Sequence, residues 1–577
     1  MPGMMTLIAL AISVAYIYSV YIVLSGGTET LFWELATLIT IMLLGHWMEM
    51  RAVSGAQSAL KELSKLLPDQ AEVLRGDRTQ IIPLSEVRSG DLVLVKPGGK
   101  IPTDGVVIEG ISDVNESMVT GESKPVPKNQ SSEVIAGTIN GDGTLKIQVT
   151  NIGEKTFLAG VMRLVAEAQS SKSRLQMLSD RAAYYLTIVA IAAGGITLII
   201  WLAVADAAFA VERMVAVLVI ACPHALGLAI PLIASISTTK AAQNGFLVKR
   251  RLALEAARNI DVVLFDKTGT LTKGEFGIDT IIPIDGENEA KVLQYAASVD
   301  SQSEHPVARA IVAEAKKRNL KIPPVKNFQR IAGKGARATI EESEIFVGSQ
   351  TLLSDLKLTL ELQAQTKVDQ LSAQGKTIIL VVVGNSLLGA IALADIIREE
   401  SREAIKSLSD FGIKTAMITG DTEDVAKWVA HELGIDEYFA RVLPEQKSEK
   451  VKLLQAKGQK VAMVGDGVND APALTQADLG IAIGAGTNVA IESAGIILVK
   501  DDPRDIPKII KLSRLTYTKM IQNLFWATGY NVVAIPLAAG VLAFKGIFLQ
   551  PALAAVFMSL STIIVAINAM ILRRKSL

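Results

Sequence analysis

The chain has 577 residues, 50% of them hydrophobic and 20% charged, and its 58 basic residues balance its 58 acidic ones. This length predicts several domains, and the neutral net charge provides no attraction for nucleic acid, so no nucleic-acid partner is expected. A single cysteine and four histidines exclude a disulfide framework and any zinc site that needs several thiolates.

Long apolar runs occur in three pairs and predict about six transmembrane helices, since each has the ~20 residues that cross a hydrocarbon core. The pairs lie within residues 1–51, 181–240 and 516–577. The first run could also be a signal peptide, but it lacks a basic start and a small-residue cleavage site. Basic residues gather near one set of helix ends, as at Arg51, Lys249 and Arg573. The positive-inside rule therefore predicts a multi-pass protein of the cell membrane, with both large loops in the cytoplasm.

The two large loops predict different folds. Residues 52–180 contain short strand patterns such as DLVLVKPG and TLKIQVT, separated by Gly and Pro, and predict a small β-rich domain. Residues 241–274 and 394–515 alternate apolar strands with helices, which favours a parallel sheet covered on both faces. An insertion, residues 275–393, has helices and strands of its own. We therefore predict a multidomain α/β membrane protein.

Polar motifs follow three predicted strands of the second loop. Asp266 comes directly after DVVLF, TGD follows IKTAMI, and GDGVNDAPAL follows KVAMV. Ligands bind at the carboxyl ends of parallel strands, where an aspartate can attack a phosphoryl group and form an aspartyl phosphate. Gly, Asp, Asn and Thr also favour plain turns, and for TGD alone the two interpretations are about equal.

The same motifs contain oxygen donors of the kind that Mg²⁺ prefers. Lys447, in LPEQK, is a candidate counter-charge for phosphate. The candidate catalytic residues here are Asp266, Thr268, Thr419, Gly420, Asp421, Lys447 and Asn469, and the candidate Mg²⁺ ligands are Asp266, Thr268, Asp466 and Asp470.

A helix-breaking motif lies inside the second pair of apolar runs, where Pro223 separates Cys222 from His224. Proline removes a backbone donor and clashes with the carbonyl four residues earlier, that of Val219. On an unbroken helix, residues two apart face different directions, so only a local break would let Cys222 and His224 bind one ion. Thiolate suits Cu(I), and imidazole suits copper or zinc. The alternative is a kinked core helix in which Cys222 is a small apolar filler.

Four motifs in this order, TGES at Thr120–Ser123, then DKTGTLT, TGD and GDGVNDAPAL, resemble the P-type ATPases over essentially the whole chain. The Cys-Pro-His motif resembles the heavy-metal branch, and within it the copper-exporting B subgroup. The resemblance implies a Rossmann-like, haloacid-dehalogenase-like phosphorylation domain, an actuator domain in residues 52–180 and a nucleotide-binding domain in residues 275–393. Members usually have two further helices before the first pair, whereas this sequence begins at MPGMM, so metal delivery is left open.

The resemblance also implies roles for particular residues. ATP would phosphorylate Asp266, and Glu122 of TGES would guide the water that hydrolyses the aspartyl phosphate. Nucleotide would bind near Glu304, His305, Gly333 and Gly335. The last helix pair would add Tyr530, Asn531, Met558 and Ser559 to Cys222 and His224, with Asn531 and Met558 ranked first. Glu49 and Asp180 resemble residues proposed for ion uptake and Glu34 one proposed for release, although helix-end solvation explains all three equally well.

We therefore expect ATP- and Mg²⁺-dependent export of copper through an aspartyl phosphate. Cu(I) is the first choice, with Cu(II) and Ag(I) as alternatives. Export of Zn(II) or another divalent metal by the same mechanism is a second hypothesis, and a membrane-anchored phosphohydrolase without transport is a third. Expected partners are the transported ion, membrane lipid and a copper chaperone.

Overall fold

The structure is a computed structural model. It describes residues 4–577 except 29, 34, 41, 45–46, 48–49, 51–66, 76–77, 117–124, 172, 223, 285, 304, 332–333, 351–357, 359–361, 385, 467–468 and 485–491. The chain forms two compact units. The first contains Met1–Arg258, Gly495–Val499 and Lys508–Leu577, and the second contains Asn259–Ala494 and Lys500–Pro507.

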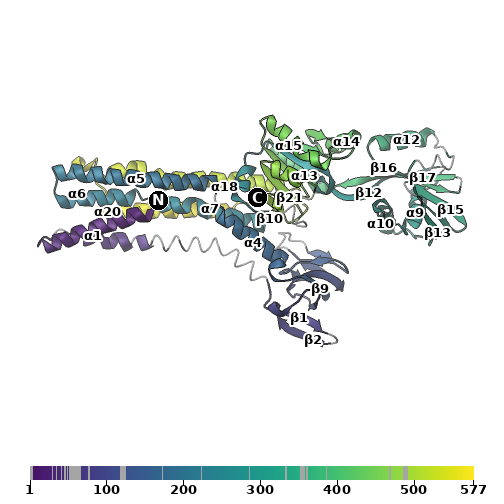
Figure 1. Cartoon of the computed structure of the whole chain (residues 1–577), viewed down its shortest axis with the longest axis horizontal. Coiled ribbons are helices and arrows are strands. Elements are labelled where there is room, and N and C mark those ends of the chain that lie inside the picture. The colour runs from purple at the N-terminus through teal and green to yellow at the C-terminus, as the bar shows by residue number, and fades with distance from the viewer. Residues whose placement is uncertain are drawn as a thin grey trace. The chain divides into compact units, whose positions relative to one another are not determined.

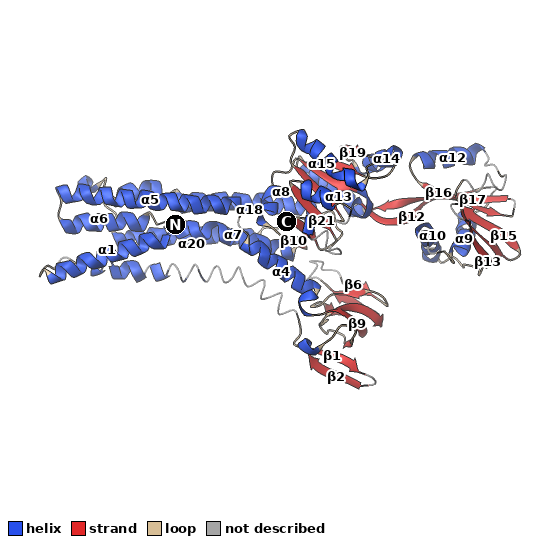
Figure 2. Cartoon of the chain, viewed as in Figure 1, coloured by secondary structure: helices blue, strands red, loops and turns tan. Residues whose placement is uncertain are grey.

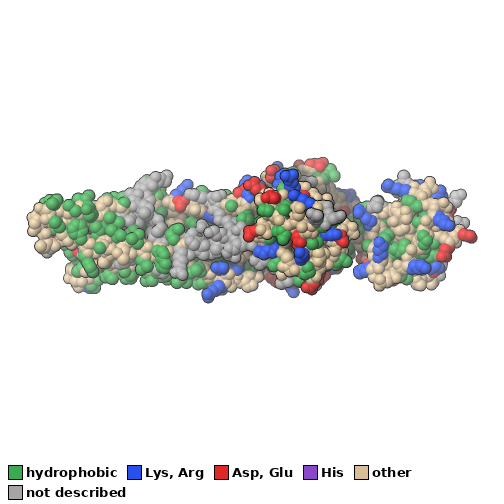
Figure 3. Space-filling view, turned by 90° about the horizontal axis from the view of Figure 1, so that it is seen from below, with side chains coloured by type: hydrophobic (Ala, Val, Ile, Leu, Met, Phe, Trp, Pro, Cys, Tyr) green, Lys and Arg blue, Asp and Glu red, His purple; other side chains and the backbone are tan. Residues whose placement is uncertain are grey.

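The helices of the first unit form an elongated bundle (Figure 1). The bundle includes α1 (Met4–Leu24), α5 (Arg174–Val204), α6 (Ala207–Ile220), α7 (His224–Gln243), α18 (Asp505–Thr528), α19 (Asn531–Ala538) and α20 (Pro551–Arg574). Within the described residues, Arg174–Val204, Ala207–Gln243 and Pro551–Arg574 are long and apolar enough to cross a membrane. Apolar helices in the first predicted pair, Ala9–Leu24 and Leu35–Leu44, are shorter. Hydrophobic side chains predominate on the visible described face of the bundle (Figure 3), as expected for a surface in contact with lipid.

The bundle packs around two apolar cores. One joins α1, α6 and α20 through residues such as Leu7, Val217 and Ala555. The other joins α7, α18 and α20 through residues such as Ile233 and Met520. Small residues permit close packing, since a Cβ added at Gly194 of α5 would lie 3.2 Å from the side chain of Leu218 on α6.

The predicted β-rich loop contains two antiparallel sheets (Figure 2). The larger has the order β2-β1-β3-β9-β4-β7 and the smaller β6-β5-β8. Their bounds are β1 (Gln70–Arg75), β2 (Arg78–Pro83), β3 (Leu92–Val95), β4 (Asp104–Glu109), β5 (Ser112–Asn115), β6 (Val126–Lys128), β7 (Glu133–Val134), β8 (Ile139–Asn140) and β9 (Leu145–Asn151). Buried Asp104 accepts hydrogen bonds from the backbone N–H groups of Ala136 (2.9 Å) and Phe157 (2.6 Å), which fixes the start of α4 (Phe157–Ser170).

Parallel strands form the centre of the second unit, in the order β21-β20-β11-β18-β19. Their bounds are β11 (Val262–Asp266), β18 (Lys414–Ile418), β19 (Glu437–Phe439), β20 (Val461–Gly465) and β21 (Leu479–Ile483). The associated helices are α13 (Glu399–Asp410), α14 (Glu423–Leu433), α15 (Lys447–Ala456) and α16 (Ala471–Gln476). The three strands predicted from the sequence are confirmed, and β11 lies between the other two.

The insertion is an antiparallel sheet with the order β12-β17-β16-β15-β14-β13. Its elements are β12 (Thr272–Pro283), α9 (Glu289–Asp300), α10 (Pro306–Lys317), β13 (Lys326–Ile331), β14 (Gly335–Ile340), β15 (Ser343–Gly348), α12 (Leu362–Ala373), β16 (Thr377–Val383) and β17 (Ser386–Ile397). Neighbouring residues of β16 alternate between two cores. Val381 joins the core of α9 and α10, whereas Leu380 and Val382 join the core that contains Val368 of α12.

In the first unit, β10 (Phe246–Val248) pairs antiparallel with β22 (Ile496–Leu498). Helix α8 (Arg251–Ala257) follows β10 and ends just before the second unit begins.

Candidate functional site

Three polar residues from distant parts of the chain meet at the carboxyl end of β11. Asp266 is the last residue of this strand, and its side chain is buried. The Lys447 ammonium donates to Asp266 Oδ1 at 2.7 Å and to Asp470 Oδ1 at 2.6 Å. Because β11, β18 and β20 are parallel neighbours, the residues that follow them reach one edge of the sheet. The fold thereby brings together a nucleophile candidate, a cation and a second carboxylate.

The turn after Asp266 is held by groups that the sequence did not single out. Gly269 has φ 75°, in the left-handed region that glycine adopts without strain. Arg398 donates from Nη2 to the Gly269 carbonyl at 3.2 Å and from Nε to the Thr272 carbonyl at 3.0 Å. Asp395 accepts from Thr272 Oγ1 at 2.6 Å. Asp395 and Arg398 lie in LADIIR, where charged residues occur at the end of an apolar run. This change in polarity is a signal that could have identified them.

The TGD motif forms a second part of the site. Thr419 is buried and donates from Oγ1 to Asp421 Oδ2 at 2.7 Å, while the Lys267 ammonium lies 2.6 Å from the same oxygen. Burial alone would raise the pKa of Asp421, but the hydrogen bonds from Lys267 and Thr419 outweigh it and lower the pKa below its usual value. Gly420 is the backbone residue between Thr419 and Asp421. TGD is therefore an anchored carboxylate turn and not a plain surface turn.

The site has more negative than positive charge. The pKa of Asp266 is raised to about 7, mainly by burial and also by the nearby Asp470 and Asp466, and Lys447 offsets these effects only in part. Thr268, Asp466 and Asn469 are exposed after the strands. Within the described residues, no group of three or more His, Cys, Asp or Glu side chains is arranged to hold a metal ion by itself. The donor set fits Mg²⁺, which binds through one or two carboxylates together with substrate phosphate oxygens.

Asp470 depends on the glycine at the end of β20. Asp470 is fully buried, and its Oδ2 has no hydrogen-bond partner. A Cβ added at Gly465 would lie 2.1 Å from that oxygen. Gly465 therefore leaves the space that the carboxylate occupies.

A second cavity, of about 270 Å³, lies in the inserted domain. His305 is the N-cap residue of α10, and its Nδ1 accepts from the Val307 N–H at 3.4 Å. Gly335 has φ 145°, and an added Cβ would lie 2.1 Å from the Val347 carbonyl oxygen, so only glycine fits this close strand pairing. The cavity is lined by residues that include Asp300, Ser303, His305, Phe328, Lys334 and Gly335. The fold thus brings the two predicted residues His305 and Gly335 to one cavity.

Asp300 is a residue of this cavity that the sequence did not indicate. It is the last residue of α9, and burial alone raises its pKa to about 7. A buried carboxyl that faces a cavity is a candidate ligand-binding group. Asp300 lies five residues before His305, and only the tertiary structure shows that both residues line the same cavity.

The apolar span that contains Cys-Pro-His is broken where proline predicts. Helix α6 ends at Ile220 and α7 begins at His224. The carbonyl of Val219, which the sequence predicts to be freed, accepts from the Cys222 N–H at 3.2 Å. The Tyr530 hydroxyl donates to the Ile220 carbonyl at 3.4 Å. Backbone groups near the break are therefore bonded again within the protein, as a membrane interior requires.

Two sulfur-containing side chains meet at this break. Cys222 is 1% exposed and packs against Met558 of α20, which is 2% exposed. The side chain of His224 lies outside the described residues. The predicted proximity of Cys222 and Met558 is thus present, while the position of the imidazole stays a prediction.

Hydrogen bonding separates two buried asparagines of the last helix pair. Asn523 donates to the carbonyls of Ala229 (3.0 Å) and Val565 (3.2 Å), and its Oδ1 accepts from Asn568 at 2.7 Å. Asn531 is 3% exposed, yet neither its Oδ1 nor its Nδ2 has a hydrogen-bond partner. Buried polar atoms rarely remain unpaired without a functional reason. Asn523 therefore ties helices together, whereas Asn531 has free donor and acceptor capacity.

The serines divide in the same way. Ser561 donates to the Trp526 carbonyl at 3.1 Å and so joins two helices, whereas the buried Oγ of Ser559 has no partner. Asn531 and Ser559 are thus the polar candidates of this pair with free buried atoms.

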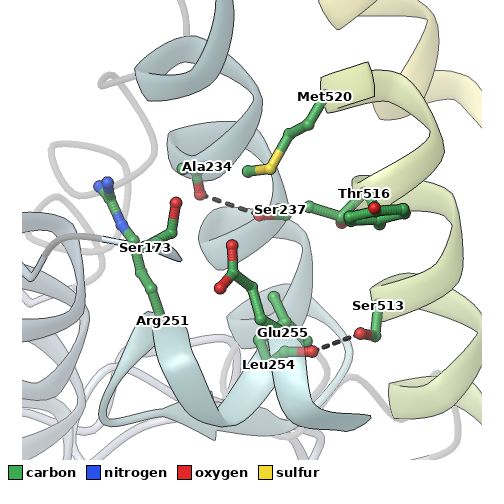
Figure 4. A pocket seen from close by; sticks show the side chains of 10 residues that line it. Ser173, Ala234, Ser237, Arg251, Leu254, Glu255, Ser513, Thr516 and Met520 are labelled. Atoms are coloured by element: carbon green, nitrogen blue, oxygen red, sulfur yellow. Dashed lines mark hydrogen bonds between the residues drawn. The ribbon is translucent and has the colours of Figure 1, made fainter. Parts of the chain in front are cut away.

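A third, much smaller cavity lies where α5, α7, α8 and α18 meet (Figure 4). Glu255 projects into it, and Ser237 beside it donates to the Ala234 carbonyl at 2.9 Å. Its volume of about 20 Å³ has room for a single water molecule. It is therefore too small to bind a nucleotide.

Comparison with known proteins identifies the family. Residues 65–166 match the P-type ATPase actuator domain, and residues 260–478 match the haloacid dehalogenase-like hydrolases. The chain is 55% identical to a copper-exporting P-type ATPase B of Archaeoglobus fulgidus, over 99% of this chain and 82% of that protein. It is 46% identical to a copper-exporting P-type ATPase B of Enterococcus hirae, over 99% and 77%. The chain belongs to the heavy-metal P-type ATPases.

A solved structure agrees with this assignment. A zinc-transporting PIB-type ATPase is 29% identical and superposes with a TM-score of 0.63, over 99% of this chain and 95% of that one. This heavy-metal P-type ATPase is accordingly a membrane-embedded, ATP-hydrolysing metal translocase with large cytoplasmic domains, and it uses ATP and Mg²⁺. A phosphohydrolase without transport is no longer a competing interpretation.

Several predicted site residues of this P-type ATPase lie outside the described residues, namely Glu34, Glu49, Glu122, Glu304 and Gly333. Asp180 is described, and it lies exposed on α5. The roles expected for these residues remain predictions.

Proposed function

We propose that this ATPase exports copper, and that it couples phosphorylation of Asp266 to ion release from the break between α6 and α7. The observation that carries the proposal is the packing of Cys222 against Met558 at a broken membrane helix. Thiolate and thioether donors select soft ions such as Cu(I). Two relatives that are named as copper exporters are 46% and 55% identical to this chain in sequence, which supports the choice of copper. Cu(I) is the proposed ion, with Ag(I) and Cu(II) as outcomes of the test.

In the cytoplasm, Asp266 is the proposed nucleophile toward the γ-phosphoryl group of ATP. Lys447 holds the carboxylate in place through its 2.7 Å hydrogen bond and supplies positive charge near the incoming phosphate. Bound Mg²⁺ would be held by Asp266 and Asp466, with Asp470 and Thr268 beside them, and would neutralise phosphate charge. Lys267 and Asp421, with Thr419, Gly420 and Asn469, keep the turn and the site edge in position. Phosphoryl transfer needs mainly such positioning and charge stabilisation.

The nucleotide base is proposed to bind in the cavity of the inserted domain. Its volume of about 270 Å³ accommodates a base, and Asp300, His305 and Gly335 line it. Glu304 and Gly333 would complete this site. Glu122, on the actuator domain, would direct the water that hydrolyses the aspartyl phosphate, so that movement of one domain separates phosphorylation from hydrolysis.

In the membrane, the proposed ion ligands are Cys222 and His224, together with Met558, Asn531, Tyr530 and Ser559. The unpaired buried atoms of Asn531 and Ser559 support their inclusion. Glu49 and Asp180 are proposed for ion uptake and Glu34 for release, with a copper chaperone as donor and lipid as the surrounding partner.

Zinc export is the second candidate, and the solved zinc-transporting relative favours it. Zinc prefers thiolate, imidazole and carboxylate ligands. Among the buried, described residues of α5, α6, α7, α19 and α20 there is no Asp or Glu. The donors present therefore favour copper.

ATPase activity measured with Cu(I), Ag(I), Cu(II) and Zn²⁺ tests the proposal. Stimulation by Cu(I) and Ag(I) is expected, with loss of the acid-stable phosphoenzyme in Asp266→Asn. Cys222→Ala should lose metal stimulation yet still accept phosphate from inorganic phosphate, because that step needs no bound ion. Stimulation by Zn²⁺ alone would transfer the proposal to zinc.

A further inference from the structure

Met42, a residue outside the predicted ligand set, packs against the sulfur pair at the helix break. It lies in the apolar helical segment Leu35–Leu44, where its side chain is partly buried. Among the partly buried hydrophobic residues of the described chain, Ile12 of α1 and Met42 pack against the buried pair Cys222 and Met558. A third sulfur-containing side chain therefore packs against the two that the proposed function already uses.

We propose that Met42 is a third sulfur ligand of the transported ion and that it restricts transport to soft monovalent ions. This inference rests on the proposed function, because it concerns the same membrane site. Thioether sulfur is a neutral, soft donor that binds Cu(I) and Ag(I) and contributes little to Zn²⁺ sites. As a packing residue alone, Met42 would be equivalent to leucine, which has a similar volume.

Charge balance supports a monovalent ion. When Cu(I) binds, the Cys222 thiol loses its proton and forms a Cu–S bond, so one thiolate charge neutralises one positive charge without any redox change. The thioethers of Met42 and Met558 add electron pairs but no charge. A divalent ion would keep one positive charge unbalanced inside the bilayer, where an uncompensated charge is costly. The buried, described residues of α5, α6, α7, α19 and α20 include no carboxylate that could balance it.

Met42→Leu tests the inference, because it keeps an apolar side chain of similar size and removes the sulfur. The matched control is Met214→Leu on α6, which changes a buried methionine, 9% exposed, that is not a neighbour of the sulfur pair. Copper K-edge X-ray absorption on the full chain, loaded with one equivalent of Cu(I), counts the sulfur donors. We expect three in the unmodified chain and in Met214→Leu, and two in Met42→Leu.

The Cu(I) concentration for half-maximal ATPase stimulation should rise at least about tenfold in Met42→Leu, since even residues that only orient metal ligands cost about 10- to 100-fold in affinity. Phosphorylation of Asp266 by inorganic phosphate should be unchanged, which verifies folding. Three sulfur donors and unchanged copper stimulation in Met42→Leu would overturn the inference.

A second variant tests the charge argument. Met42→Cys supplies a second thiolate, so it should restore the third sulfur donor and admit Zn²⁺ as a stimulating ion. Two sulfur donors in this variant would also reject Met42 as a ligand. If Cys222→Ala kept normal copper stimulation, the proposed membrane site itself would be wrong. Failure of the Met42 variants alone, with Cys222→Ala inactive, would leave that site intact.

Discussion

Replacing Asp300 by asparagine should stabilise the nucleotide-binding domain in a pH-dependent way. Asp300 is buried, and burial raises the pKa of its carboxyl from 3.8 to about 7. The folded domain therefore binds a proton more tightly than the unfolded chain does, and folding loses stability as the pH rises from about 4 to about 7. Asparagine has nearly the same shape as aspartate and no charge to desolvate, so the Asp300→Asn variant should escape this loss.

The size of the effect follows from the two pKa values. The raised pKa of Asp300 lowers the free energy of unfolding by about 4 kcal/mol at pH 8 and by about 2 kcal/mol at pH 5, relative to a low pH at which both states are protonated. The stability gained by Asp300→Asn should therefore increase by about 2 to 3 kcal/mol between pH 5 and pH 8, because the constant cost of burying an amide cancels in the comparison.

Hydrogen exchange of the full chain, read from peptides of α9 and α10, measures the local opening free energy at both pH values. The control Asp369→Asn changes an exposed carboxyl of α12 in the same domain. Its opening free energy should depend on pH in the same way as that of the unmodified chain. An equal gain for Asp300→Asn at pH 5 and pH 8 would refute the reasoning, since it would mean that the carboxyl ionises in the folded domain as easily as in water.

Three further predictions concern the other parts of the site. Lys447→Met should lower the free energy of unfolding of the phosphorylation domain by about 3 to 5 kcal/mol, because it removes the cation from a buried ion pair. Adding Asp266→Asn should recover part of that loss, and thermal unfolding scans measure both changes. Asn531→Ala should abolish Cu(I)-stimulated ATPase activity, whereas Ser561→Ala, which removes a helix-joining hydrogen bond of about 1 kcal/mol, should retain most of it; equal losses would contradict the distinction between them. Gly335→Ala should weaken ATP binding at least tenfold in an equilibrium binding assay, because its Cβ would overlap a backbone carbonyl oxygen at 2.1 Å; an unchanged affinity would show that the β14–β15 pairing adapts.

Periodicity and motif order predict much of the fold and of the cytoplasmic site of this protein. The strands that precede Asp266, Thr419 and Asp466 are mostly apolar, as expected for strands buried on both faces, so their type and parallel arrangement are predictable. Pro223 indicates the break for a similar local reason, since proline lacks the backbone N–H that the interior of a helix uses. The same residue type does not end every helix here, because Pro231 lies inside α7. These features depend on local chemistry, which the sequence states directly.

Only the tertiary structure separated residues of the same chemical type. Asn523 of α18 and Asn531, the first residue of α19, are both buried asparagines. Three neighbours form hydrogen bonds with the Asn523 side chain, whereas the Asn531 side chain has no hydrogen-bond partner. Asp300 and Met42 belong to no recognisable sequence motif. Only the tertiary structure shows that Asp300 lines a cavity with His305 and that Met42 packs against Cys222 and Met558. Sequence determines which groups a chain contains and which elements they form, whereas burial and partners depend on contacts between segments hundreds of residues apart.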